Sequence, residues 1–203
     1  MLRRTALALA CLSLALLSLA ACGGSSGGDS GPKTYENSEY GFALTYPGAF
    51  ERVDSKDTPI MQQMEFSTTF ADPASADEAK AHDEVVDAAV VAVSRLPQTL
   101  TKAEVRDVLR KTAEQMQGMS GTDLGYGFND VSVSLQPLTT FAGAPCLTYE
   151  MTYSNDAGAL LHDRSYMFIK GDTYYAIQLT AAEDRWQQSS PTLQGIADSF
   201  RIL

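Results

Sequence analysis

The sequence has few cysteines, few histidines and a shortage of basic residues. It contains three Cys and two His among 203 residues. Cys11 and Cys22 lie in the first 22 residues, which are typical of a removed leader followed by a lipid-modified Cys, so only Cys146 would remain as a free thiol. An intramolecular disulfide is therefore excluded in the mature chain, and packing must hold the fold together. Cys146 enters an alternating apolar run, which predicts a buried, inert thiol.

The shortage of basic residues argues against two classes of partner. The chain has 15 Lys and Arg against 25 Asp and Glu, which gives a net charge of −10 at pH 7. Loss of a leader that carries two Arg and no acidic residue would change −10 to −12. Nucleic acid and anionic lipid headgroups need concentrated Lys and Arg, so we expect neither as a partner.

The chain also lacks a long apolar run after residue 22, whereas one lies at its start. Arg3 and Arg4 precede an apolar stretch from Ala6 to Leu19, and Leu19-Ala20-Ala21-Cys22 follows it. This order is similar to a bacterial lipoprotein signal, in which the Cys sulfur receives a diacylglyceryl group carrying fatty acids such as palmitate. We therefore predict a signal peptide over residues 1–21 and lipid attachment at Cys22. One alternative is an uncleaved membrane anchor, but the apolar run is shorter than the roughly 20 residues that a spanning helix needs. The other alternative is an ordinary secretory signal.

Residues 22–33 are predicted to form a flexible linker between the lipid and the folded domain. The tract is rich in Gly and Ser and cannot bury enough apolar surface to offset the entropy of ordering. Its average reach is about 17 Å. We expect one domain over residues 34–203.

Alternating apolar residues predict most of the strands. Phe42, Leu44 and Tyr46 alternate, and so do residues from Ile60 to Phe70. The run Val85–Val93 is apolar throughout and favours a strand buried on both faces, although its Ala content leaves a helix open. The C-terminal half predicts a β-meander that begins with a strand over 131–135. Three successive strands over 147–153, 160–170 and 174–180 are joined by tight turns and are therefore expected to be antiparallel neighbours.

Capping signals predict the helices. Asp72-Pro73 favours a short helix start, and Thr101 with Glu104 forms a capping box ahead of a longer helix. That longer helix is predicted to have one apolar face and to end near Gly118 and Gly121; the face consists of Val105, Val108, Leu109, Thr112 and Met116. Ser190-Pro191 predicts the start of a last helix with a stripe of Leu193, Ile196, Ala197 and Phe200, preceded by a separate short helical turn at Trp186.

No residue set in the sequence matches a known reaction centre. The G-x-S-x-G elbow, the S-x-x-K motif with its partners and a phosphate loop between strand and helix are all absent. The acidic stretch 72–87 with His82 has neither calcium-loop nor HExxH spacing, so we predict a solvated helix face and no metal or other cofactor. Only His82 and His162 could serve as a base at neutral pH, and His162 shares a strand face with Arg164 and Tyr166. These three are the candidate ligand-binding or acid–base residues, and a packed or solvated strand face is the favoured alternative.

Several short patterns resemble the Mog1/PsbP-like family. They are Tyr40-Gly41-Phe42-Ala43-Leu44-Thr45-Tyr46-Pro47 with Phe50, Ala142-Gly143-Ala144-Pro145, the strand around Arg164 and Tyr166, and Ile196-Ala197-Asp198-Ser199-Phe200. The resemblance covers most of residues 34–203. It implies an α+β fold with a central antiparallel β-sheet flanked by helices, an α/β/α sandwich. It also implies a protein-binding scaffold of the kind found in photosystem extrinsic subunits, a nuclear-transport GTPase cofactor and bacterial lipoproteins, with no shared catalytic motif.

These observations predict a membrane-anchored extracytoplasmic lipoprotein that acts as a non-catalytic binding or accessory module for a cell-envelope protein. A lipid or apolar small-ligand carrier that uses the Met- and Tyr-rich strand faces is the main alternative. A weak hydrolase centred on His162 is a further one. A closed apolar cavity would favour the carrier, and a nucleophile beside His162 would favour the hydrolase.

Overall fold

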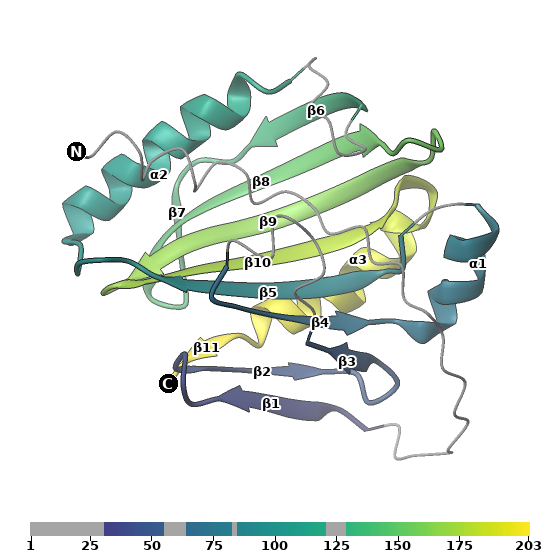
Figure 1. The fold of residues 1–203 in the computed structure, drawn as a ribbon, viewed down its shortest axis with the longest axis horizontal. Coiled ribbons are helices and arrows are strands. Elements are labelled where there is room, and N and C mark those ends of the chain that lie inside the picture. The colour runs from purple at the N-terminus through teal and green to yellow at the C-terminus, as the bar shows by residue number, and fades with distance from the viewer. Residues whose placement is uncertain (1–30, 55–63, 83–84, 121–128) are drawn as a thin grey trace.

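The computed structural model describes residues 31–54, 64–82, 85–120 and 129–203, and its main element is an eight-stranded antiparallel sheet (Figure 1). The predicted leader, residues 1–21, and most of the predicted linker lie outside the described residues. Along the sheet the order is β3 (Glu51–Val53), β4 (Phe66–Ala71), β5 (Ala88–Arg95), β10 (Thr173–Ala182), β9 (Leu160–Lys170), β8 (Ala144–Ser154) and β6 (Asn129–Leu135), with β7 (Thr139–Phe141) paired to the start of β8.

A second, three-stranded sheet brings the beginning and the end of the domain together. It has the order β1 (Lys33–Asn37), β2 (Phe42–Tyr46) and β11 (Arg201–Ile202). Arg201 and Ile202 pair with Ala43 and Phe42, so the last strand is held by one of the first. Figure 1 shows this small sheet beside the β3–β4 edge of the large one.

Helices cover both faces of the large sheet, as predicted for an α+β sandwich. α2 (Lys102–Gln117) packs on β8, β6 and β9, while α3 (Glu183–Asp198) packs on β10, β5, β9 and β2. The short η2 (Pro73–Ser75) and α1 (Ala76–Ala81) follow β4. Among the described residues no helix is long and apolar enough to cross a bilayer.

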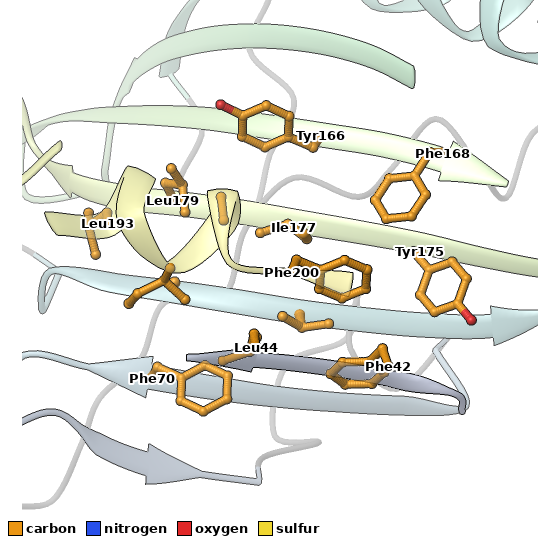
Figure 2. Close-up of a cluster of buried hydrophobic side chains, with 14 of the residues drawn as sticks. Phe42, Leu44, Phe70, Tyr166, Phe168, Tyr175, Ile177, Leu179, Leu193 and Phe200 are labelled. Carbon is orange, nitrogen blue, oxygen red and sulfur yellow. The ribbon is translucent and has the colours of Figure 1, made fainter. Parts of the chain in front are cut away.

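The two faces of the sheet carry different cores. On the α3 side an aromatic core joins both sheets: Phe42 of β2 stacks on Phe200 with ring centroids 5.3 Å apart, and Phe168 stacks on Tyr175 at 5.2 Å (Figure 2). On the α2 side, buried residues of α2 pack with the Met and Tyr face of β8; they include Val105, Leu109, Met116, Leu147, Tyr149, Met151 and Tyr153. The helix face and strand face expected from the sequence thus meet in one core.

The predicted C-terminal meander is confirmed. β8, β9 and β10 are consecutive antiparallel neighbours, and β9 has the bounds Leu160–Lys170 expected from the alternation. The turns contain Gly158 at φ 84° and Gly171 at φ 65°, in the left-handed region that glycine enters without a steric penalty.

Both capping predictions are also confirmed. The Asp72 carboxylate accepts a hydrogen bond from the backbone N–H of Ala74 at 3.0 Å, with Pro73 as the first residue of η2. At the start of α2 the Thr101 hydroxyl accepts from the Glu104 N–H, and the Glu104 carboxylate accepts from the Thr101 N–H at 2.8 Å. Helix α2 ends at Gln117, and Gly118 is its C-cap; Gly121 lies outside the described residues.

The predicted helix start at Ser190-Pro191 is wrong. α3 begins at Glu183 and continues to Asp198 with Pro191 inside it, so Trp186 belongs to the same helix and not to a separate turn. Pro191 is exposed, while Trp186, Leu193 and Ile196 are buried on one side of the helix. Burial of this face on both sides of the proline therefore outweighs the backbone hydrogen bond that proline removes.

The expected strand over Ile60 to Phe70 was too long. β4 covers Phe66–Ala71, and residues 60–63 lie outside the described part of the chain. Met64 packs in the α2-side core, whereas Phe66 and Phe70 face the aromatic core, so the expected single face does not extend to Met64.

Candidate functional site

The alternation of β9 places the three candidate residues on the sheet face that α3 covers. His162 stacks on Trp186, while Arg164 and Tyr166 both hydrogen-bond to Gln194, a residue of α3 two turns farther on. The structure thus brings His162, Arg164 and Tyr166 together along the same helix, and it adds partners from β8 and α3.

His162 lies between two carboxylates and against an indole ring. Its Nδ1 is 2.6 Å from Oε2 of Glu183, and its Nε2 is 3.6 Å from Oε2 of Glu150. The imidazole lies parallel to the Trp186 ring, with centroids 4.0 Å apart and planes 6° apart. Within the described residues the buried Nε2 has no hydrogen-bond partner. Two carboxylates and an aromatic face therefore hold the imidazole in place.

Arg164 fixes the position of Glu150 from the neighbouring strand. Arg164 and Glu150 are directly opposite each other in the β8–β9 register, and Nε and Nη2 donate to Oε1 at 2.8 and 2.6 Å. Nη1 donates to Oε1 of Gln194 at 3.0 Å, and the guanidinium carbon lies 5.5 Å from the Trp186 ring centroid. One cation therefore holds a β8 acid, an α3 amide and the ring on which His162 stacks.

Tyr166 is a packed residue and not an open surface group. Its hydroxyl donates to Oε1 of Gln194 at 2.7 Å, and Phe141 stacks on its ring at 5.0 Å. Burial raises the pKa of Tyr166, and the hydrogen bond with Gln194 opposes that shift. Gln194 in turn donates to Asp198 at 2.7 Å. Tyr166 therefore anchors α3 on β9.

Next to these residues the sheet presents exposed hydroxyl groups. Ser132 and Ser134 of β6 are exposed and pair in register with Thr152 and Glu150 of β8. We call this surface the polar patch, and its residues are Ser132, Ser134, Glu150, Thr152, His162, Arg164 and Glu183. The arrangement offers fixed hydrogen-bond donors and acceptors to a ligand. The hydrogen bonds and ion pairs that His162 makes in the described residues go to carboxylates.

The acidic stretch 72–87 is only partly the solvated face that the sequence predicted. Asp77 and Glu78 are exposed, but Asp87 is buried, and its Oδ1 accepts from Nε and Nη2 of Arg185 at 3.2 and 2.9 Å. Ser189 donates to the other oxygen of Asp87. The solvated-face prediction is wrong for Asp87 because α3 supplies a cation and a hydroxyl that compensate its buried charge.

Asp87, Arg185 and Ser189 line a polar pocket of about 410 Å³ between α1 and the start of α3. His82 lies there with Asp72 and Glu78, far along the chain from His162. The part of the chain that the structure describes contains no group of three or more His, Cys, Asp or Glu side chains suited to a metal ion. Asp83 and Glu84 lie outside it.

A family model described as PsbP matches residues 30–202. The chain belongs to the PsbP family. Among solved structures, the solution structure of cyanobacterial PsbP (CyanoP) from Synechocystis sp. PCC 6803 is similar over 91% of this chain and 99% of that one, with 21% identity and a TM-score of 0.56. At this identity the likeness shows the fold alone.

Two further solved structures are similar to this PsbP-family chain. A protein of Bacteroides thetaiotaomicron VPI-5482 matches 84% of this chain and 48% of its own length, at 10% identity and a TM-score of 0.50. LpqN, described as involved in cell envelope biogenesis of Mycobacterium tuberculosis, matches 87% of this chain and 86% of its own length, at 17% identity and a TM-score of 0.49. No curated protein matches.

Sequence reasoning about this PsbP-family chain missed the partners of the three candidate residues. Glu150 could have been found, because pairing the strands predicted at 147–153 and 160–170 around their short turn puts it opposite Arg164. Glu183, Trp186 and Gln194 could not, because they reach these residues only through the packing of α3 on the sheet.

Proposed function

We propose that this PsbP-family chain is a membrane-tethered, extracytoplasmic accessory module that binds a cell-envelope protein through the polar patch. Lipid at Cys22 would hold it at the membrane, and the linker would let the domain reach its partner. The tether would raise the effective concentration of the domain near that partner.

The observation that carries the binding role is a preformed polar surface. The side chains of Glu150 and Arg164 are each 29% exposed, yet an ion pair holds them together. The side chain of Glu183 is 42% exposed, and its Oε2 is held 2.6 Å from Nδ1 of His162. A partner that meets them finds charges already in position, which lowers the ordering cost of association. Ser132, Ser134 and Thr152 lie beside them on β6 and β8 and offer further small hydrogen-bonding groups.

The packing of β8 limits the carrier alternative. The Met and Tyr face expected to bind an apolar ligand is buried under α2, where Tyr149, Met151 and Tyr153 belong to the α2-side core. A carrier that used this face would have to displace α2. The hydrolase alternative would require a nucleophile hydrogen-bonded to His162, whereas the ring nitrogens of His162 face the carboxylates of Glu150 and Glu183.

Site-specific photo-crosslinking in the native envelope tests the proposal. A photoreactive side chain at exposed Ser134, inside the patch, is compared with one at exposed Gln115, on α2 across the sheet. We expect one reproducible protein adduct from position 134 and none of that mass from position 115. Arg164→Met should lower its yield, because Glu150 and Gln194 then lose their common donor.

Two results would overturn the binding role. One is the absence of a protein adduct at position 134 together with a small molecule that co-purifies with the domain. The other is an adduct whose yield is the same from positions 134 and 115. A Cys22→Ala form separates the tether from the surface, since it should lose the adduct unless the partner is supplied in solution.

A further inference from the structure

A second titratable group lies directly behind the polar patch. Asp163 follows His162 on β9, so its side chain points to the opposite face of the sheet, where the residue is only 1% exposed. A fully buried carboxyl group on a sheet is costly unless it is paired or neutral. Its surroundings therefore decide its protonation state.

The carboxyl group of Asp163 is held by neutral side chains. The Thr180 hydroxyl donates to Oδ1 at 2.6 Å, and the Gln178 amide donates to Oδ2 at 3.0 Å and to Oγ1 of Thr180 at 3.3 Å. Tyr153 faces it from β8, and burial keeps the Tyr153 pKa well above its ordinary value, so that hydroxyl stays neutral. The three neighbours come from the two strands that flank β9.

In the described chain, no Lys or Arg side chain from the elements packed around Asp163 pairs with its carboxyl group. The buried side chains of α2 are Val105, Leu109, Thr112 and Met116, none of which is charged. On the other face, Arg164 pairs with Glu150, and His162 lies between Glu150 and Glu183. Burial accordingly raises the pKa of Asp163 to about 7, and the hydrogen bonds from Thr180 and Gln178 only partly oppose it.

We propose that Asp163, Gln178, Thr180 and Tyr153 form a proton-responsive device in the sheet, in which a proton on Asp163 tightens the β8–β9–β10 pairing and its loss loosens that pairing. The device belongs to the fold and does not depend on the proposed binding role. His162 is the preceding residue of β9, so weaker pairing of β9 at Asp163 also changes how firmly His162 is held in the polar patch.

The direction of the effect follows from linkage. The folded chain binds this proton more tightly than the unfolded chain, so the stabilisation is complete below about pH 4 and is lost as the pH rises to about 7. One proton changes the unfolding equilibrium constant about tenfold per pH unit, so the full loss approaches about a thousandfold. Above about pH 7 the effect is constant.

Two measurements on the whole folded domain test the device. The first is an NMR titration of the Asp163 carboxyl carbon in the unmodified chain, for which we expect a midpoint near pH 7. The second compares the unfolding constants of wild type and Asp163→Asn from pH 4 to 8. Their ratio should rise about tenfold per pH unit up to about pH 7 and then level off. Asp156→Asn, an exposed carboxyl group in the β8–β9 turn, is the matched control and should show no such trend.

Amide exchange locates the loosening. At pH 8 the β9 and β10 amides should open more often in wild type than in Asp163→Asn, and at pH 4 the two should agree. If Asp163→Asn fails to fold, Thr180→Val replaces it, and loss of its hydrogen bond should move the Asp163 midpoint upward. A midpoint near pH 4, a ratio of unfolding constants that is independent of pH, or equal amide opening at pH 8 would each overturn the proposal.

Discussion

At the scale of single residues, Cys146 shows how burial sets reactivity. Its side chain is fully buried, and burial raises the pKa of the thiol to about 11, with opposing hydrogen bonds from Thr148 and the Met167 backbone. At pH 8 the reactive thiolate is therefore a very small fraction of the population. We predict that Cys146 resists a maleimide reagent in the folded chain and reacts fully in denaturant.

The measurement is the labelling rate of a Cys11→Ala/Cys22→Ala form, in which Cys146 is the only thiol. Labelling of the folded chain at the rate of a small-molecule thiol would contradict the description of Cys146 as a packed side chain.

The Glu150–Arg164 pair should contribute to positioning more than to stability. Both side chains are 29% exposed, so solvent screens the attraction between them. In a double-mutant cycle with Glu150→Gln and Arg164→Met, we predict a coupling free energy below about 1 kcal/mol from chemical denaturation. A coupling free energy above about 2 kcal/mol would mean that water screens the pair less than its 29% exposure implies.

At the scale of elements, α3 makes the most specific prediction. Pro191 and Gly195 both lie inside this helix, both are exposed, and a Cβ at Gly195 would meet no atom within 4 Å. Gly195→Ala should raise the free energy of unfolding by about 1 kcal/mol. Pro191→Ala should also stabilise, because it restores a backbone N–H inside the helix.

Urea denaturation of the two variants and the parent measures both effects. If α3 instead began at Ser190, as the sequence suggested, Pro191 would occupy a favourable first-turn position and Pro191→Ala would destabilise.

The elements that sequence reasoning found are those whose signals are local. The alternation and turns of β8, β9 and β10 and the capping box at Thr101 and Glu104 are each complete within a few residues. The two-residue β11 is too short to show a pattern, because its pairing with β2 depends on chain segments far apart in the sequence. The helix start at Glu183 was missed because burial on both sides of Pro191 outweighs the proline.

The candidate site was predictable only on one strand. Alternation placed His162, Arg164 and Tyr166 on one face, but Glu183, Trp186 and Gln194 approach that face through the packing of α3. Packing of this kind is a tertiary property, and no local pattern encodes it. The buried state of Asp87 was missed for the same reason, since Arg185 and Ser189 lie about a hundred residues later.

At the scale of the whole molecule, the aromatic core joins the two sheets, and Phe42 is central to it. Phe42 is fully buried and contacts the rings of Tyr35, Tyr175 and Phe200 at centroid distances of 5.9, 6.4 and 5.3 Å. We predict that Phe42→Ala lowers the free energy of unfolding by about 3–5 kcal/mol in denaturant titrations.

The matched control is Leu160→Ala, because Leu160 is 46% exposed and its loss should change stability by about 0.5 kcal/mol or less. Equal losses for the two variants would show that the small sheet does not depend on this core.

The domain and its predicted tether act together in the proposed function. A two-chain lipid anchor gives stable attachment, since each buried CH₂ contributes about 0.8 kcal/mol. The PsbP-family domain would then supply a fixed polar surface close to the membrane, and binding would depend on proximity as well as on contact.

The mass of the mature protein extracted from its native membrane tests this tethered arrangement most directly. We predict a chain that begins at Cys22, lacks residues 1–21 and carries a diacylglyceryl group on the Cys22 sulfur. A mature chain without acyl groups, or one that retains residues 1–21, would contradict it.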